Sequence, residues 1–147
     1  MTAADDDRAA IGTYRLVGRG SDLGIDVTGP TAEACLCATV AGVAASVATV
    51  DDEVARRDEH IRLVGGTAVE LLVGLVDEVI VRLDADGELA VDLAGARIDG
   101  EGLRGVLELV TLADVTLGGT APKAATWHGA RLEPEGDRWT GHVTIDL

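Results

Sequence analysis

The sequence predicts an α+β fold: a single domain in which two helices pack on one face of a mostly antiparallel, mixed β-sheet. Three observations support this. Apolar residues make up 47% of the 147 residues, enough for one core in a chain of this length. Two long segments carry apolar residues at helical spacing. The segments around them alternate apolar and polar residues, as half-buried strands do.

Residues 1–10 are small, acidic and polar, so we expect a disordered leader there and a folded domain over residues 11–147. The leader lacks the apolar segment of a signal peptide, and no apolar run reaches membrane-spanning length. We therefore expect a cytoplasmic protein that makes no contact with a membrane.

In the first third of the chain the residue pattern predicts two strands and a helix. Residues 14–17 form a short strand, and apolar residues alternate over 23–27 in a second one. The glycine-rich loop 18–22 between them lacks the spacing of a phosphate-binding or dinucleotide-binding loop. Thr31 is the expected N-cap of an amphipathic helix that carries apolar residues as far as Val50.

The rest of the chain predicts a strand, a second helix and then strands alone. A third strand covers residues 60–64, and Thr67 with Glu70 forms a capping box that opens the second helix. That helix should end near residues 84–87. Alternating residues and turn signals then predict strands to the end of the chain, most clearly over residues 138–147.

Charge and aromatic content limit the classes of partner. The 26 acidic residues outnumber the 12 basic ones and give a formal charge of −14, which would repel a phosphate backbone. Aromatic residues make up only 2% of the chain, so stacking on bases is disfavoured as well. We expect no direct contact with nucleic acid. An acidic surface suits cations or a basic protein partner, although it also serves solubility alone.

Cys35 and Cys37 lie two residues apart on the first predicted helix, where their side chains point to different sides. They cannot readily form a disulfide, and a lone C-x-C pair is a poor zinc signal. We interpret both as small core or boundary residues.

Lys123 is the only lysine, since arginine supplies the other eleven basic side chains. An ammonium group meets a phosphate or carboxylate as a point charge, which a planar guanidinium does not reproduce. Lys123 is therefore a candidate functional residue, and a solvated lysine at a strand end is the alternative.

Asp22 and Asp146 are candidate ligands for a metal ion, joined by the terminal carboxylate of Leu147. Ca²⁺ prefers such oxygen ligands. The alternative is an Asx-turn at Asp22 and a solvated Asp146, because nothing in the linear sequence brings the two together. A catalytic carboxylate pair would further require a substrate pocket.

The three histidines, His60, His128 and His142, show no metal-ligand spacing, so surface or hydrogen-bonded roles are favoured over ligation. Ser21 precedes Asp22 without a nearby histidine or a nucleophile elbow, and a hydrolase triad is therefore a weak hypothesis.

Four segments together resemble the archease family. Residues 14–29 are similar to its opening strand, turn and capped helix, and residues 71–79 to its Leu-Leu-rich helix, with Leu75 where Trp is usual. Residues 123–129 resemble its Lys-Ala-x-Thr-aromatic-His-Gly run, and residues 143–147 its chain-ending apolar-Asp-apolar pattern. The resemblance covers residues 12–147. One departure is that Arg19 replaces the His of the family's His-Thr-Ala-Asp turn, and Gly20-Ser21 replaces Thr-Ala.

The resemblance implies an accessory protein, not an enzyme, that binds a divalent cation, calcium above all, through Asp22 and Asp146. It implies an RtcB-type GTP-dependent RNA ligase as partner, whose guanylylation and turnover the protein promotes in tRNA splicing and RNA repair. Lys123 and His128 would then act in partner activation. The alternatives are a small metal-dependent hydrolase that uses the same carboxylates and a chaperone-like binding module. A hydrolase would turn over a substrate alone, and a chaperone would need a sizeable exposed apolar patch.

Overall fold

A computed structural model describes residues 11–147; the expected acidic leader at residues 1–10 lies outside the described residues. The strands and helices of the described part follow one another along the chain as β1 (Thr13–Arg19), β2 (Asp22–Gly29), α2 (Ala32–Val47), β3 (Ala48–Thr49), β4 (Arg57–Val64), α3 (Ala68–Asp86), β5 (Glu88–Asp99), β6 (Gly102–Thr111), a 3₁₀ turn (Leu112–Asp114), β7 (Thr116–Leu117), β8 (Ala124–Glu135) and β9 (Arg138–Asp146).

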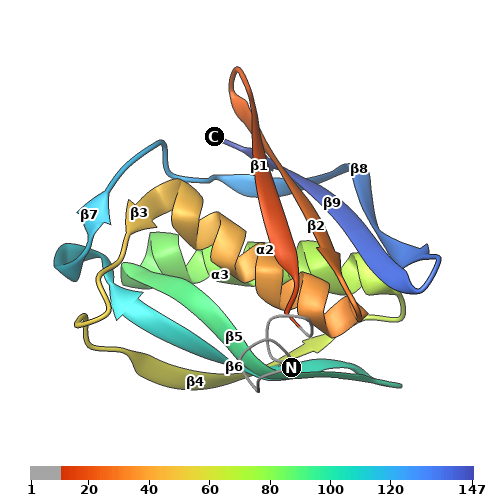
Figure 1. Ribbon diagram of the computed structural model, residues 1–147. Coiled ribbons are helices and arrows are strands. Elements are labelled where there is room, and N and C mark those ends of the chain that lie inside the picture. Colours follow the sequence, from red (N-terminus) through yellow and green to blue (C-terminus); the bar gives the residue numbers. More distant parts are fainter. Residues whose placement is uncertain (1–10) are drawn as a thin grey trace, which may run out of the picture.

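The strands form two large antiparallel sheets with the helices between them (Figure 1). One sheet has the order β1-β2-β9-β8 and the other the order β4-β6-β5, while β3 and β7 form a short ribbon. All the strand pairs of the described part are antiparallel. The predicted α+β class, with two helices and a single domain, is confirmed, and the structure adds that a second sheet covers the far side of the helices.

Both helices begin where the sequence predicts, because each start is determined by a local cap. The Thr31 hydroxyl accepts from the amide of Ala34 at 3.1 Å, and the Thr67 hydroxyl accepts from the amide of Glu70 at 3.3 Å. Each bond satisfies one of the amides that a helix start leaves free. Helix α3 ends as predicted at Gly87, whose φ of 64° is the left-handed conformation that glycine adopts at little cost.

Helix α2 ends at Val47, so the predicted extension to Val50 is wrong. The chain turns into β3, which pairs with β7. The carbonyl of Val47 accepts from the amide of Gly118 at 2.8 Å. Val50 is still apolar for a reason, since it packs against a small core cluster beside this ribbon. The apolar periodicity therefore predicted correctly that Val50 contacts the core. The pairing of β3 with β7, and not helix propensity, determines the backbone conformation after Val47.

The main core lies between the sheets and is built from aliphatic side chains of both helices and of β2, β6 and β9. Leu36, Leu72 and Ile145 are fully buried there. Inward residues of β2 and β9 alternate with outward ones, so Leu23 and Ile145 point to the core and their neighbours Asp22 and Asp146 to the outer face.

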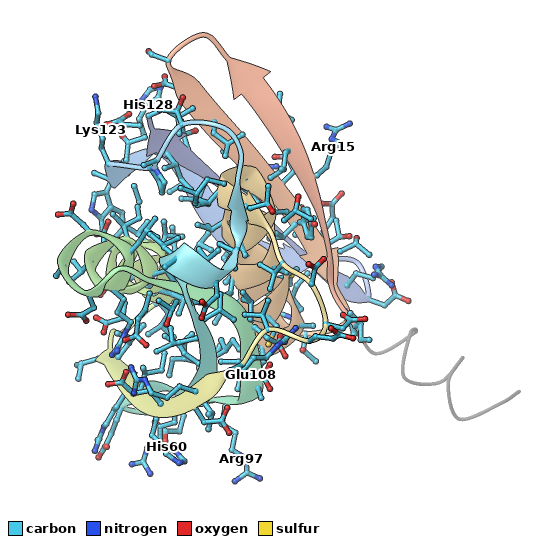
Figure 2. The ribbon with its side chains drawn as sticks, turned by 90° about the vertical axis from the view of Figure 1, so that its left-hand side faces the viewer. Arg15, His60, Arg97, Glu108, Lys123 and His128 are labelled. Atoms are coloured by element: carbon cyan, nitrogen blue, oxygen red, sulfur yellow. The ribbon has the colours of Figure 1, made fainter. Side chains whose placement is uncertain are left out.

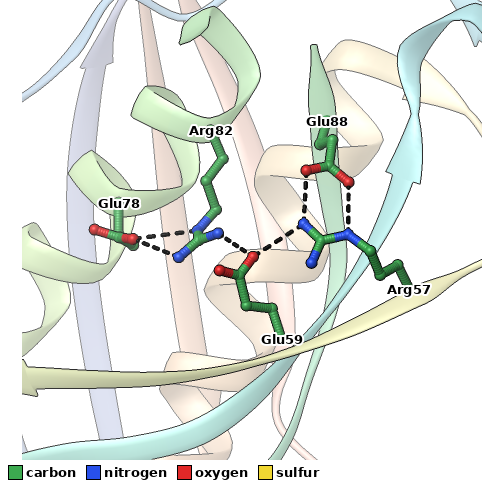
Figure 3. Close-up of polar contacts among 5 residues, drawn as sticks. All are labelled: Arg57, Glu59, Glu78, Arg82 and Glu88. Carbon is green, nitrogen blue, oxygen red and sulfur yellow. Dashed lines mark hydrogen bonds and ion pairs between the residues drawn. The ribbon is translucent and has the colours of Figure 1, made fainter. Parts of the chain in front are cut away.

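Charged side chains join α3 to the sheet β4-β6-β5 (Figure 3). Arg82 of α3 pairs with Glu78 and with Glu59 of β4. Arg57 pairs with Glu59 and, through two hydrogen bonds of 2.7 and 3.1 Å, with Glu88. The network lies at the end of the protein where α3 runs into β5, and it ties together three elements.

Neither helix in the described part is long and apolar enough to cross a membrane.

Candidate functional site

Asp22 and Asp146 come together at one end of the sheet β1-β2-β9-β8. They are direct partners in the register of β2 with β9. Directly opposed residues of antiparallel strands place their side chains on the same face, with Cβ atoms about 5 Å apart. Asp22 is half-buried and Asp146 exposed. The structure thus supplies the proximity that the linear sequence could not show.

Lys123 and Leu147 lie at the same end of this sheet. The amide of Lys123 donates to the carbonyl of Asp146 at 2.8 Å, and the amide of Leu147 donates to the carbonyl of Ser21 at 2.9 Å. These bonds connect the β1-β2 turn, the end of β9 and the start of β8 through main-chain groups. The Lys123 side chain is exposed, so a rigid backbone presents a free ammonium group.

The carboxylate pair is suited to a hard cation. Two opposed carboxylates repel one another unless a cation lies between them, and Ca²⁺ accepts carboxylates, main-chain carbonyls and water as ligands. Over residues 11–147 no group of three or more His, Cys, Asp or Glu side chains has metal-binding geometry. A cation bound here would therefore take two side-chain carboxylates and complete its shell with main-chain oxygens or water.

Helix α3 supports the start of β8 from the inside. Asp77, on the exposed side of α3, accepts from the amide of Ala125 at 3.3 Å. Strand β8 is an edge strand, and an edge amide of this kind is otherwise left to solvent. The bond therefore fixes the segment that carries Lys123 relative to the helix.

His128 lies further along β8, in a segment that departs from the regular ladder. Thr126 pairs with Thr144 and Arg131 with His142, so the four residues 127–130 of β8 lie opposite the single residue Val143 of β9. The intervening residues form a wide bulge in which Trp127 and His128 are exposed. Figure 2 shows Lys123 and His128 at one end of the molecule and His60 at the opposite end. His60 therefore belongs to no common site with them.

His142 belongs to a polar chain that the sequence did not reveal. Its Nδ1 lies 2.6 Å from Oδ1 of Asp26, and its Nε2 lies 3.0 Å from Oγ1 of Thr144. Arg15 donates to the other oxygen of Asp26 at 3.2 Å. Partial burial tends to raise the pKa of Asp26, but the hydrogen bonds from His142 and Arg15 outweigh it and the pKa is lowered. The expectation of a hydrogen-bonded histidine is confirmed for His142.

The sequence contained one indication of this hydrogen-bonded group. The alternation of β2 and β9 places Asp26 and His142 on the outward face of the sheet. The two residues are 116 positions apart, however. Only the register of the two strands makes them neighbours.

Both cysteines are free, as predicted. Burial raises the pKa of each thiol to about 11, so both remain protonated and unreactive near neutral pH. Cys35 is fully buried in the core.

A cleft of about 370 Å³ lies at the opposite end of β9 from Asp146. It is lined by the starts of both helices together with Ile98 and Trp139. The separation along β9 from Trp139 to Asp146, about 3.3 Å for each residue, keeps the cleft apart from the carboxylate pair.

Comparisons with known proteins agree with this architecture. The chain is 29% identical over 134 residues to proteins from two strains of Mycobacterium tuberculosis, each named "Probable protein archease"; the match covers 91% of this chain and 74% of theirs. The solution structure of protein 1598 from Methanobacterium thermoautotrophicum has the same fold, with a TM-score of 0.68, 17% identity, and coverage of 91% and 98% of the two chains.

A crystal structure from Thermotoga maritima, described as an archease and possible chaperone, also has this fold. Its TM-score is 0.63 at 16% identity, over 90% of this chain and 96% of that one. The model of the Archease protein family (MTH1598/TM1083) matches residues 14–147, a range that includes the opposed aspartates, Lys123 and the β8 bulge. The chain therefore belongs to the archease family.

Proposed function

We propose that this protein activates an RtcB-type GTP-dependent RNA ligase in the cytoplasm, promoting its guanylylation and turnover in tRNA splicing and RNA repair. In this proposal Asp22, Asp146 and the carboxyl group of Leu147 hold a divalent cation, calcium above all. Lys123 and His128 act on the ligase. The observation that carries the proposal is the direct pairing of Asp22 with Asp146, with the exposed Lys123 joined to Asp146 through the main chain.

The position of Lys123 supports a role outside the protein. Of the ion pairs between side chains that the structure describes, none includes Lys123, Asp22 or Asp146. An exposed ammonium without an internal partner is available to a phosphate or carboxylate of another molecule. Placed beside a cation site, it could meet a partner that the same site helps to orient.

The net charge fits a partner that itself binds RNA. A ligase that holds RNA needs basic surface to contact phosphates, and an acidic protein of charge −14 complements such a surface. The accessory protein would then bind the ligase without competing for the RNA backbone.

A chaperone-like binding module is the second candidate, because the Thermotoga maritima protein is described as a possible chaperone. Such a role depends on a contiguous exposed apolar patch. Large exposed apolar side chains occur at Ile11 and, on β1, at Tyr14 and Leu16; the others lie on separate elements, at Val64 of β4, Val81 of α3, Leu117 of β7 and Trp127 of β8. Only the residues at and before β1 are close in sequence, and this distribution favours contact with one specific partner over a broad chaperone surface.

The test is single-turnover guanylylation of the cognate ligase, with and without this protein, in calcium and after chelation. We expect the protein to accelerate the step and chelation to reduce the acceleration. The protein alone should not hydrolyse GTP or RNA. A ligase that is guanylylated at the same rate in the presence and absence of the protein would contradict the proposal, and turnover by the protein alone would favour a hydrolase.

A further inference from the structure

The imidazole ring of His142 lies in a fitted position on the outer face of the sheet β1-β2-β9-β8. The Asp26 carboxylate can only accept a hydrogen bond, so Nδ1 of His142 is the donor in the 2.6 Å contact. In the neutral ring Nε2 is then an acceptor, and the Thr144 hydroxyl donates to it at 3.0 Å. Both ring nitrogens are used, and the orientation of the ring is fixed.

Gly24 leaves room for this ring, and Gly129 lies beside it. A Cβ atom at Gly24 would lie 3.2 Å from Cε1 of His142, a distance at which one of the two groups must move. A Cβ atom at Gly129 would lie 4.0 Å from Cδ2 on the other side. The ring therefore lies between the backbones of β2 and β8. Its neighbour on β8, Gly129, has a φ of 74° and belongs to the bulge.

The bulge leaves the regular ladder, and within it the amide of His128 donates a hydrogen bond to the Thr126 hydroxyl at 3.2 Å. The register of β8 with β9 breaks between Thr126 and Arg131, opposite Thr144 and His142. Extra residues at a bulge leave the regular pairing and redirect side chains. Here they carry Trp127, which is 58% exposed, and His128. His142 is the β9 residue at which the pairing resumes, with Arg131, and its ring lies beside Gly129 of the bulge.

We propose that His142 is a positioning residue, whose imidazole, held by Asp26 and Thr144 between Gly24 and Gly129, fixes the β8 bulge and so presents Trp127 and His128 as a contact point for the partner. The effect of this positioning on ligase activation rests on the proposed function, whereas the positioning itself can be tested on this protein alone. A preformed contact point costs less ordering on binding, and tryptophan is often an anchor at interfaces.

The first experiment measures amide hydrogen exchange in the variants His142→Ala and Gly24→Ala, with His60→Ala and Gly18→Ala as controls. His60 is exposed on the other sheet, and a Cβ at Gly18 would meet nothing within 4 Å. We expect exchange over residues 126–131, which include the ladder residues at both ends of the bulge, to accelerate about tenfold or more in the first two variants, as for a local opening that costs less free energy. Exchange in β6 should stay unchanged, and the controls should behave as the parent.

Gly24→Ala keeps His142 and crowds its ring, which must shift by a few tenths of an ångström, so it separates a change of position from loss of the side chain. His142→Asn retains a donor toward Asp26 and should restore part of the protection. Unchanged exchange over residues 126–131 in both His142→Ala and Gly24→Ala would overturn the positioning role, as would equal acceleration throughout β6.

The second experiment measures ligase guanylylation at saturating concentrations of each variant. We expect His142→Ala to lower the maximal rate about tenfold, a partial loss of preorganised contact. If the parent activates the ligase and His142→Ala activates it equally despite a mobile bulge, the link from bulge to activation is wrong while the proposed function stands. If the parent does not activate the ligase, the proposed function fails, and the exchange data still decide the positioning.

Discussion

One end of each large sheet carries a charge cluster, and the two clusters are arranged in opposite ways. At β4-β6-β5, Arg57, Glu59, Arg82, Glu78 and Glu88 form a connected network of opposite charges (Figure 3). At the end of β1-β2-β9-β8, two carboxylates face one another across the register. The first arrangement stabilises the fold through mutual pairing. The second opposes folding unless a cation is present.

The difference separates polar groups that pair within the protein from polar groups whose proposed role is toward a cation or a partner. The Arg82 side chain is only 14% exposed, and its guanidinium pairs with Glu59 and Glu78. It is therefore not available to bind another molecule. Lys123 is exposed and bonded through its main chain alone. Substitutions in the network should therefore lower stability without changing activation, and substitutions at the carboxylate end should change activation without lowering stability.

Lys123→Met should give the largest effect and tests the functional side of this comparison. Loss of a charge that meets a partner's phosphate or carboxylate should lower ligase activation about a hundredfold, or about 2.7 kcal/mol. Lys123→Arg should recover only part of it, because the guanidinium differs in shape and reach. The melting temperature should stay unchanged, since the side chain is exposed. Activation assays beside thermal melts decide it: full activation by Lys123→Met would mean that this lysine is merely solvated.

Asp22→Asn and Asp146→Asn should each weaken calcium binding about tenfold, because affinity in oxygen-ligand sites depends on the number of charged ligands. Without calcium, either variant should be slightly more stable than the parent, since it removes one of two opposed like charges. Calorimetric titration measures the affinity, and melts with and without calcium measure the stability. If both variants bind calcium as the parent does, or if the parent binds none, Asp22 and Asp146 do not form a calcium site.

Much of the fold could be predicted because its signals are local. The caps at Thr31 and Thr67 and the left-handed Gly87 each act within one turn of a helix, and the alternation in β9 follows from the pleat of a single strand. The end of α2 could not be predicted, because β3 exists only through its pairing with β7. Nor could the division of the strands into two sheets, which depends on how the strands pair.

The site divides in the same way. Lys123 could be singled out from composition alone. Asp22 and Asp146 could be proposed as oxygen ligands from their own chemistry, and the family resemblance implied the same pair. Their proximity, however, follows from the register of β2 with β9, in which buried Leu23 lies opposite buried Ile145. Asp26 and His142 become partners through that same register, and no spacing in the sequence predicts this contact.

Arg82→Met tests the structural side of the comparison. The variant keeps much of the aliphatic stem but leaves Glu59 and Glu78 without their shared partner. We expect a loss of about 1 to 2 kcal/mol in the free energy of unfolding, reduced from a fully buried case because both carboxylates are about one-third exposed. Ligase activation at saturating protein should stay unchanged.

Urea denaturation gives the stability of Arg82→Met, and Arg62→Met is the matched control. Arg62 pairs with Glu101 where both side chains are more than half exposed, so its loss should be hardly measurable. Equal destabilisation by the two variants would show that the network contributes no more to the free energy of unfolding than an exposed ion pair does.

The smallest expected effect concerns acid, and it compares one carboxylate from each sheet. Hydrogen bonds from Arg57 chiefly lower the pKa of Glu88, against a smaller opposing effect of burial. For Asp26 partial burial raises the pKa, but the bonds from His142 and Arg15 prevail and lower it. A carboxyl group with a lowered folded-state pKa contributes stability above its ordinary value, 4.5 for Glu88 and 3.8 for Asp26. That stability is lost as the pH falls through the lowered folded-state value.

Asp26→Asn and Glu88→Gln should therefore each reduce the loss of stability on acidification below about pH 4.5, while exposed Asp52→Asn should leave it unchanged. Urea midpoints recorded between pH 6 and pH 2.5 give the measurement. Because Asp26 also holds His142, its variant should in addition loosen the β8 bulge at neutral pH, whereas Glu88→Gln should not. If all three variants lose stability in parallel with the parent, acid unfolding is governed by other carboxylates, and neither sheet's hydrogen-bonded carboxylate is a pH-dependent support of the fold.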